Sequence, residues 1–298
     1  MTMSFGLSTF LTDEGLSPTE LAIAMEERGF DALFVCEHTH YPVHAPDPPD
    51  TDLPPRDYRR SLDPFVALAA AATVTRRLRL GTGIALITQR DPIILAKEAA
   101  SLDVLSGGRF QLGVGAGWIR EELRNHGTDP RTRFAMMRER VLAVKRIWTQ
   151  DEAEFHGDFV EFAPIQSWPK PVQQPHVPIL IGGNGPTVLD RVLDYGDGWA
   201  PNLTSTPDQL VADIAELRRR SRELGREHIP VTLLGADRRS FDRSRRPGAM
   251  EPLRRQEIAM LADGGLDHCV FFRDASLSRS AALRELDALV KLTEQFRT

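Results

Sequence analysis

Short apolar runs alternate with segments of helical periodicity along the whole chain of 298 residues. Most of these runs are continuous rather than alternating, which is typical of parallel strands covered on both faces. We expect eight strands, at residues 4–10, 32–36, 78–87, 110–115, 177–182, 198–201, 231–235 and 268–272. Strand–helix alternation repeated eight times predicts a single α/β domain over residues 1–298, a (β/α)8 TIM barrel, with two Rossmann-like halves as the competing architecture.

The helices between the strands have recognisable starts. A capping residue precedes a proline at Ser17, Asp63, Asp91 and Thr206, and Ser17 is also followed three residues later by Glu20. Gly107-Gly108 closes the helix that precedes the fourth strand. Apolar stripes at helical spacing, which we expect to face the core, lie at Phe134, Met137, Val141, Val144 and Trp148 and at Leu210, Ile214, Leu217 and Leu224.

Two insertions depart from a plain barrel. Residues 40–61, after the second strand, are rich in proline and aspartate. We expect no helix there and a long loop that overhangs the barrel mouth. After the fourth strand, residues 154–162 alternate around Gly157-Asp158, which predicts a small β-hairpin, followed by a proline-rich stretch.

Glycines gather at the ends of several predicted strands, where a barrel places its active site. Glycine lets a backbone approach a ligand closely because it has no Cβ. We therefore expect one phosphate-holding pocket at this rim. Its candidate residues are Thr82, Gly83 and Ile84 in the third strand; Gly113, Gly115 and Gly117, then Trp118 and the acids Glu121 and Glu122, after the fourth; and Gly182, Gly183 and Asn184 after the fifth.

Further candidates for chemistry follow the second strand. Glu37 and His38 could form an acid–base pair, because histidine titrates near neutrality, with His40 nearby. The alternative is a histidine that is merely hydrogen-bonded at a strand end. Trp118 and Trp199 could wall a flat ring system or simply pack against helices. Arg273, after the eighth strand, could pair with an anionic substrate or lie solvated at the surface.

Composition excludes several classes of function. A net charge of −5 gives no reason to expect nucleic acid. Apolar runs do not reach membrane-spanning length, and the start lacks the basic region of a signal peptide, so we expect a cytoplasmic protein. The only two cysteines, Cys36 and Cys269, lie in apolar runs without a metal-ligand spacing, so we expect buried thiols and no metal. GxSxG, HExxH and Walker motifs are absent, and the GxGxxG fingerprint is incomplete.

The order of four motifs resembles the luciferase-like flavin/deazaflavin oxidoreductase family, and most of all its actinobacterial branch that depends on the deazaflavin coenzyme F-420. The motifs are LGTGIALITQRDP, AKEAASLDVLSGGRFQLGVGAGWIREE, HGDFVEF and WPKPVQQPHVPILIGGNGPTVLDRVLDYGDGWAP. The resemblance covers residues 3–225 strongly. It implies a TIM-like barrel with the cofactor ring at the mouth, backed by a non-proline cis peptide in a bulge of the third strand at Gly83-Ile84.

The resemblance also implies roles for residues at the rim. Glu37 and His38 would lie near the reactive face, and the cofactor tail would contact Gly115, Gly117, the 118–122 turn, Gly182 and Gly183. The family's sugar-phosphate dehydrogenases carry a catalytic glutamate where this chain has Trp118, which argues against that substrate.

The expected reaction is hydride transfer between the cofactor ring and a small organic substrate. An FMN-dependent monooxygenase and a barrel that binds a flavin or deazaflavin without turnover are the alternatives. A homodimer is possible.

Overall fold

The computed structural model describes residues 3–44, 55–202, 206–226, 228–236, 253–273, 275 and 277–296. Its main sheet runs in the order β10-β11-β1-β2-β3-β5-β8-β9, and each neighbouring pair in this order is parallel. The strands are β1 (Ser4–Thr9), β2 (Ala32–Val35), β3 (Arg79–Thr82), β5 (Phe110–Gly115), β8 (Ile179–Gly182), β9 (Gly198–Ala200), β10 (Thr232–Leu234) and β11 (His268–Arg273).

Two isolated parallel bridges, Trp199 to Val231 and Asn202 to Leu234, join β9 to β10 and bring the sheet round on itself. The predicted barrel is therefore confirmed, and the alternative of two Rossmann-like halves is wrong. Because the strands are parallel, their carboxyl ends share one rim, which gathers the loops after β2, β5 and β8.

The third predicted strand is split in two. Its first part is β3, and its second part is β4 (Ala85–Leu86), which pairs with β5. Between them the peptide bond joining Gly83 and Ile84 is cis, as the family resemblance implied.

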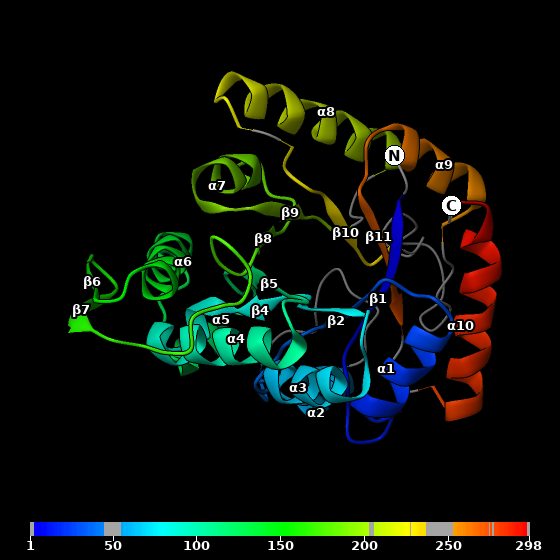
Figure 1. Cartoon of the computed structure of the whole chain (residues 1–298), viewed down its shortest axis with the longest axis horizontal. Helices are drawn as coiled ribbons and strands as arrows, with labels where there is room; N and C mark the ends of the chain where they lie inside the picture. The colour runs from blue at the N-terminus through cyan, green and yellow to red at the C-terminus, as the bar shows by residue number, and fades with distance from the viewer. Residues whose placement is uncertain are drawn as a thin grey trace.

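Helices cover the outside of the barrel (Figure 1). They are α1 (Pro18–Glu27), α3 (Pro64–Val74), α4 (Pro92–Ser106), α6 (Arg133–Thr149), α7 (Val188–Tyr195), α8 (Pro207–Glu223), α9 (Arg255–Asp263) and α10 (Arg279–Thr293). The four predicted caps are confirmed: the side chains of Ser17, Asp63, Asp91 and Thr206 accept backbone hydrogen bonds at the starts of their helices. Gly107, with a φ of 66°, ends α4 as expected.

The core has two layers. A small apolar cluster in the barrel interior packs against Ile84; its members are Ala32, Phe34, Leu180, Ala200, Leu234 and Val270. A larger cluster lies between the strands and the helices. Two members of the predicted stripes do not belong to it. Phe134 is 41% exposed, and Leu224 is 61% exposed just after the end of α8.

The two insertions differ in their outcome. The expectation of no helix in residues 40–61 is wrong for α2 (Pro55–Arg60), where proline opens the helix and Tyr58 packs into the interior. Residues 45–54 lie outside the described residues. The predicted hairpin is confirmed as the antiparallel pair β6 (Ala153–His156) and β7 (Glu161–Ile165). Figure 1 shows it beyond α6, at the periphery of the molecule.

Candidate active site

A buried histidine–carboxylate pair lies at the rim. His38 follows β2, and Glu122 lies on the short helix α5 (Arg120–Asn125) that follows β5. His38 Nδ1 is 2.9 Å from Glu122 Oε2, and the two side chains are 5% and 0% exposed. A carboxylate only accepts hydrogen bonds, so Nδ1 carries the hydrogen and Nε2 of a neutral ring remains an acceptor. This geometry gives His38 the arrangement of an oriented general base.

This pairing corrects two predictions. The acid partner of His38 is Glu122, 84 positions away, and not the adjacent Glu37. Glu122, which we expected to contact the cofactor tail, instead points into the interior. Its other oxygen, Oε1, is buried and has no hydrogen-bond partner among the described residues.

Aromatic rings enclose the imidazole. The Tyr58 ring, from α2, lies 4.4 Å from the His38 ring, and the Phe10 and Trp118 rings lie 6.0 and 6.2 Å from it. Trp118 is 44% exposed, whereas Tyr58 is buried. The structure is thus consistent with the expected position of Trp118 at the rim. The site opens to solvent on the side of Trp118. Sequence reasoning missed Tyr58 because it lies in a segment that we expected to be a loop.

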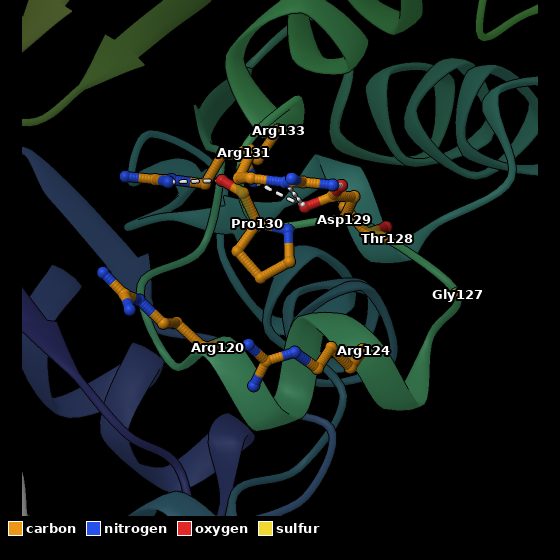
Figure 2. A pocket seen from close by; sticks show the side chains of 8 residues that line it. All are labelled: Arg120, Arg124, Gly127, Thr128, Asp129, Pro130, Arg131 and Arg133. Carbon is orange, nitrogen blue, oxygen red and sulfur yellow. Dashed lines mark hydrogen bonds and ion pairs between the residues drawn. The ribbon is translucent and has the colours of Figure 1, made fainter.

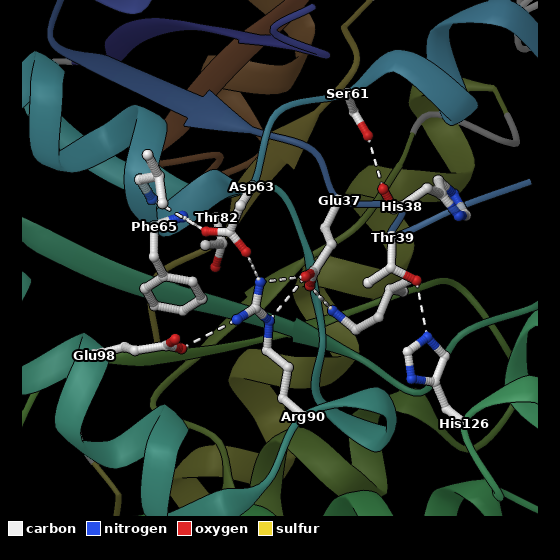
Figure 3. A network of polar contacts seen from close by, with 12 residues as sticks. Glu37, His38, Thr39, Ser61, Asp63, Phe65, Thr82, Arg90, Glu98 and His126 are labelled. Carbon is white, nitrogen blue, oxygen red and sulfur yellow. Dashed lines mark hydrogen bonds and ion pairs between the residues drawn. The ribbon is translucent and has the colours of Figure 1, made fainter.

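Glu37 belongs to a separate ion-pair network (Figure 3). Its Oε1 accepts from Arg90 Nε at 2.8 Å, and its Oε2 accepts from the backbone N–H of Leu86 at 2.6 Å. Arg90 also pairs with Asp63 and, at 3.0 Å, with Glu98. Both carboxylate oxygens of Glu37 are therefore engaged, so Glu37 holds β4 in place and is badly placed to transfer a proton.

The carboxylates around Arg90 stabilise its positive charge. Burial acts to lower the pKa of Arg90, but the charge of Glu37 and hydrogen bonds to Glu37 and Asp63 raise it above its ordinary value. Arg90 was missed by sequence analysis. Its signal is an arginine that directly precedes the Asp91-Pro92 helix start, close behind a strand end.

The glycines of the rim have two different roles. A Cβ at Gly115 would lie 2.0 Å from Ile84 Cδ1, and one at Gly182 would lie 2.8 Å from the same atom. These two glycines therefore make room for the Ile84 side chain. At Gly183, with a φ of 107°, a Cβ would meet nothing within 4 Å, so this backbone borders open space. Gly117 has a φ of 76°, which favours glycine.

Thr82 and Cys36 stabilise the strand that carries Ile84. Thr82 Oγ1 donates to the Gly113 carbonyl at 2.7 Å, and Thr82 is fully buried, so its hydroxyl is engaged within the fold. Its expected contact with the cofactor stays a prediction. Cys36 Sγ donates to the Gly83 carbonyl at 3.0 Å. Burial raises the pKa of Cys36 to about 12, so it is a neutral thiol. Cys269 is buried as well.

Three residues that we expected to contact the cofactor or the substrate make contacts within the fold. The Asn184 amide exchanges two hydrogen bonds with the backbone of Asn202, at 2.6 and 2.9 Å. Trp199 is 1% exposed and donates to the Gly183 carbonyl at 2.9 Å, so the packing alternative holds. Arg273, the last residue of β11, is 1% exposed and lies 3.8 Å from Glu285 on α10, so the alternative of a solvated surface arginine is wrong. Its pairing with an anionic substrate stays a prediction.

Glu121 and His40 are peripheral. Glu121 pairs with Arg124 at 3.4 Å on the solvent side of α5. Both ring nitrogens of His40 are engaged, one by Thr39 and the other by Asn125.

The rim also offers polar atoms that suit a ligand. The side-chain amide of Gln89 is buried, and neither its nitrogen nor its oxygen has a hydrogen-bond partner among the residues described. Its nitrogen lies 3.7 Å from the position that a Cβ of Gly117 would take. Together with the open backbone at Gly183, these groups fit a cofactor with a flat ring and a polar tail.

Among the described residues, no helix combines the length and the apolar character that a membrane span requires. The same residues contain no group of three or more histidine, cysteine, aspartate or glutamate side chains suited to a metal ion.

Comparison with known proteins identifies the family. The model of the luciferase-like monooxygenase family matches residues 16–236. An uncharacterized protein of Mycobacterium tuberculosis is 46% identical over 202 residues, which are 66% of this chain and 71% of the relative. An F420-dependent glucose-6-phosphate dehydrogenase of Amycolatopsis mediterranei is 31% identical over 188 residues, 60% of this chain; the chain spans about half (51%) of that relative.

Two solved structures share the fold. An F420-dependent secondary alcohol dehydrogenase in complex with an F420–acetone adduct aligns with a TM-score of 0.77 and 21% identity, over 100% of both chains. Monooxygenase RslO1 from Streptomyces bottropensis aligns with a TM-score of 0.77 and 21% identity, over 98% of this chain and 99% of that one. The chain therefore belongs to the luciferase-like monooxygenase family of oxidoreductases.

Proposed function

We propose that the protein is a deazaflavin-dependent oxidoreductase that transfers hydride between the cofactor and a small organic substrate, with His38 handling the accompanying proton. The observation that carries the proposal is the buried His38–Glu122 pair, 2.9 Å apart, at the carboxyl-end rim of the barrel. The F420-dependent relative at 31% identity supports the choice of cofactor.

His38 and Glu122 supply the acid–base chemistry. In the oxidising direction the hydroxyl of a bound alcohol would give its proton to His38 Nε2. In the reducing direction His38 Nε2 would return a proton to the carbonyl oxygen. Glu122 fixes the ring orientation and faces the positive charge that the ring gains when it accepts the proton, because its Oε2 lies 2.9 Å from Nδ1.

The cofactor supplies the hydride acceptor and donor. Ile84 would support its ring, and the backbone at Gly117 and Gly183 together with the Gln89 amide would hold its polar part. Ile84, Trp118 and Tyr58 give this side of the rim an apolar and aromatic character, which suits an uncharged substrate. Trp118 stands where the sugar-phosphate dehydrogenases carry their catalytic glutamate, so a sugar phosphate is a poor candidate.

Cofactor titration tests the choice of cofactor. Fluorescence titration of the purified protein with oxidised F-420 and with FMN is expected to give the tighter binding for F-420. Tight binding of FMN and none of F-420 would favour the second candidate, an FMN-dependent monooxygenase, which the matched family model supports.

Variants test the proton-transfer role. Turnover is followed by the absorbance of the oxidised deazaflavin, with a panel of small secondary alcohols in one direction and their ketones in the other. His38→Asn should lower kcat by about 100-fold or more, as expected on removal of a general acid or base, with cofactor affinity within a few-fold. Unchanged turnover in this variant rejects the role of His38.

The neighbouring acids provide a matched pair for Glu122. Glu122→Gln should lower kcat because it weakens the support of the imidazolium, whereas Glu121→Gln, at an exposed position on the same helix, should leave kcat unchanged. Equal effects of the two variants would contradict a specific role for the buried pair.

A further inference from the structure

Three successive side chains of the segment that carries His38 contact α5 or the residue that follows it, and the chain bends at the middle one. The contacts are His38 Nδ1 to Glu122 Oε2 at 2.9 Å, Thr39 Oγ1 to His126 Nε2 at 2.8 Å, and His40 Nε2 to Asn125 Nδ2 at 2.9 Å. Figure 3 shows the second contact beside His38. The His38–Glu122 pair is thus the buried inner end of a row of contacts between the same two parts of the chain.

The outer contacts form a hydrogen-bond chain with one direction. Asn125 Nδ2 donates to His40 Nε2, so the neutral His40 ring carries its hydrogen on Nδ1 and donates it to Thr39 Oγ1 at 2.8 Å. The single hydrogen of the Thr39 hydroxyl is then left for His126 Nε2. Burial and the charge of His40 hold the pKa of His126 below its ordinary value, which favours the neutral ring that accepts this hydrogen.

α5 is held in place by contacts of its own. Leu123, on the helix, is 1% exposed, and beyond the helix Thr128 Oγ1 donates to the Thr88 carbonyl at 2.8 Å. The backbone N–H of Thr128 also donates to the Leu123 carbonyl at 2.9 Å. The helix is therefore a fixed support against which the segment 38–40 can be held.

The segment 38–40 depends on two kinds of anchor. The His38 carbonyl accepts from Ser61 Oγ at 2.8 Å (Figure 3), which fixes the backbone at residue 38. The next two residues are tied to the end of α5 through the side chains of Thr39 and His40. Because the backbone bends at Thr39, we expect loss of these outer contacts to turn the His38 ring relative to Glu122.

The side of α5 away from Glu122 adjoins the proposed cofactor site. Arg120 and Arg124 line a cavity of about 690 Å³ there (Figure 2), next to the 118–122 turn that the family resemblance implies as a tail contact. Because α5 has its own anchors, a change at Thr39 should leave this cavity intact. Cofactor affinity therefore separates an effect on His38 from general damage to the rim.

We propose that Thr39 and His126 are positioning residues for His38. With His40 and Asn125 they form a clasp that holds the segment 38–40 against α5 and keeps His38 Nε2 directed at the substrate. The expected effect on turnover rests on the proposed function, whereas the effect on the His38 ring is measurable without it.

Variants of Thr39 and His126 test the clasp by kinetics. Thr39→Val keeps the shape of the side chain and removes its hydroxyl; it should lower kcat by about three- to tenfold, as expected for the loss of one hydrogen bond, with the cofactor dissociation constant within a few-fold. Thr39→Ser is the matched control and should keep kcat. His126→Gln, whose amide oxygen can accept the Thr39 hydrogen, should keep most of kcat, whereas His126→Leu should lower it as Thr39→Val does.

A double-mutant cycle shows whether Thr39 acts through His38. In the His38→Asn background, Thr39→Val should cause no further fall in kcat, because the residue that it positions is already absent. The same fold-change in both backgrounds would mean that Thr39 acts elsewhere, and it would reject the proposal. Equal losses in Thr39→Val and Thr39→Ser would reject it as well. Thr39 and His126 are exposed, and circular dichroism checks that each variant folds.

Nuclear magnetic resonance measures the His38 ring without turnover. The chain has eight histidines, and in protein labelled with 15N-histidine the His38 signals are assigned by their loss in His38→Asn. The wild type should show a single tautomer with hydrogen on Nδ1. Thr39→Val should shift or split these signals, and Thr39→Ser should preserve them. Signals of His38 that are identical in the wild type and Thr39→Val overturn the clasp whatever the activity, whereas a shift without turnover on any deazaflavin overturns only the proposed function.

Discussion

The amino-end face of the barrel contains a partly buried histidine, His268, whose titration should lower the stability of the fold in acid. His268, at the start of β11, bonds through Nδ1 to Ser4 Oγ, and the Arg79 guanidinium lies 3.4 Å from the same nitrogen. Burial, and then the positive charge of Arg79, lower the pKa of His268 from 6.5 to about 4. The folded protein therefore holds this ring neutral in a pH range where the unfolded chain protonates it.

The sign and size of the effect follow from proton linkage. Between pH 6.5 and about 4 the unfolded state binds a proton that the folded state does not. His268 therefore leaves the free energy of unfolding unchanged above pH 6.5 and lowers it progressively as the pH falls toward 4. The interval corresponds to about 3 kcal/mol of unfolding free energy at most.

Urea unfolding at several pH values between 7.5 and about 4.5 measures this contribution. His268→Gln retains a polar side chain but cannot gain a charge. Its free energy of unfolding should fall less steeply with decreasing pH than that of the wild type, and the gap between the two should change by about 2–3 kcal/mol. His156→Gln, at a histidine that is 62% exposed on the hairpin, is the control and should follow the wild type. Parallel curves for the wild type and His268→Gln would refute the reasoning.

The remaining predictions concern the rim. Gly115→Ala should destabilise the protein by about 1–3 kcal/mol in urea unfolding, because its Cβ would lie 2.0 Å from Ile84 Cδ1; Ile84→Val, which removes that methyl, should restore most of the loss, and no restoration would contradict the steric cause. Arg90→Met should cost about 3–5 kcal/mol because it leaves Glu37 buried without its partner. Arg90→Lys should recover part of this cost, and a stability like that of the wild type in Arg90→Met would show that the network matters little.

Much of the fold could be predicted because its signals are local. Continuous apolar runs located the strands, and capping residues before prolines located the helix starts. The α2 helix was missed because proline was read as a breaker, whereas a proline at the first helical position costs no hydrogen bond. The buried position of Tyr58 is a tertiary property that no local pattern encodes.

The site was harder to predict because its contacts are long-range. Glu37 and His38 are adjacent in the sequence, but successive side chains of an extended segment point to opposite sides. Glu37 therefore meets Arg90, and His38 meets Glu122, 84 positions away. Glycine was equally ambiguous: the same residue type makes room for Ile84 at position 115 and borders open space at position 183.

The packing of Ile84 against Gly115 and Gly182 has a consequence for how such a site can diversify. The three positions share one volume, so a methyl group gained at one must be given up at another. A smaller residue at position 84 alone would enlarge the space behind the proposed cofactor ring, whereas a larger residue at either glycine position requires a smaller residue at position 84. Related chains with a side chain at position 115 or 182 should therefore carry a smaller residue at position 84.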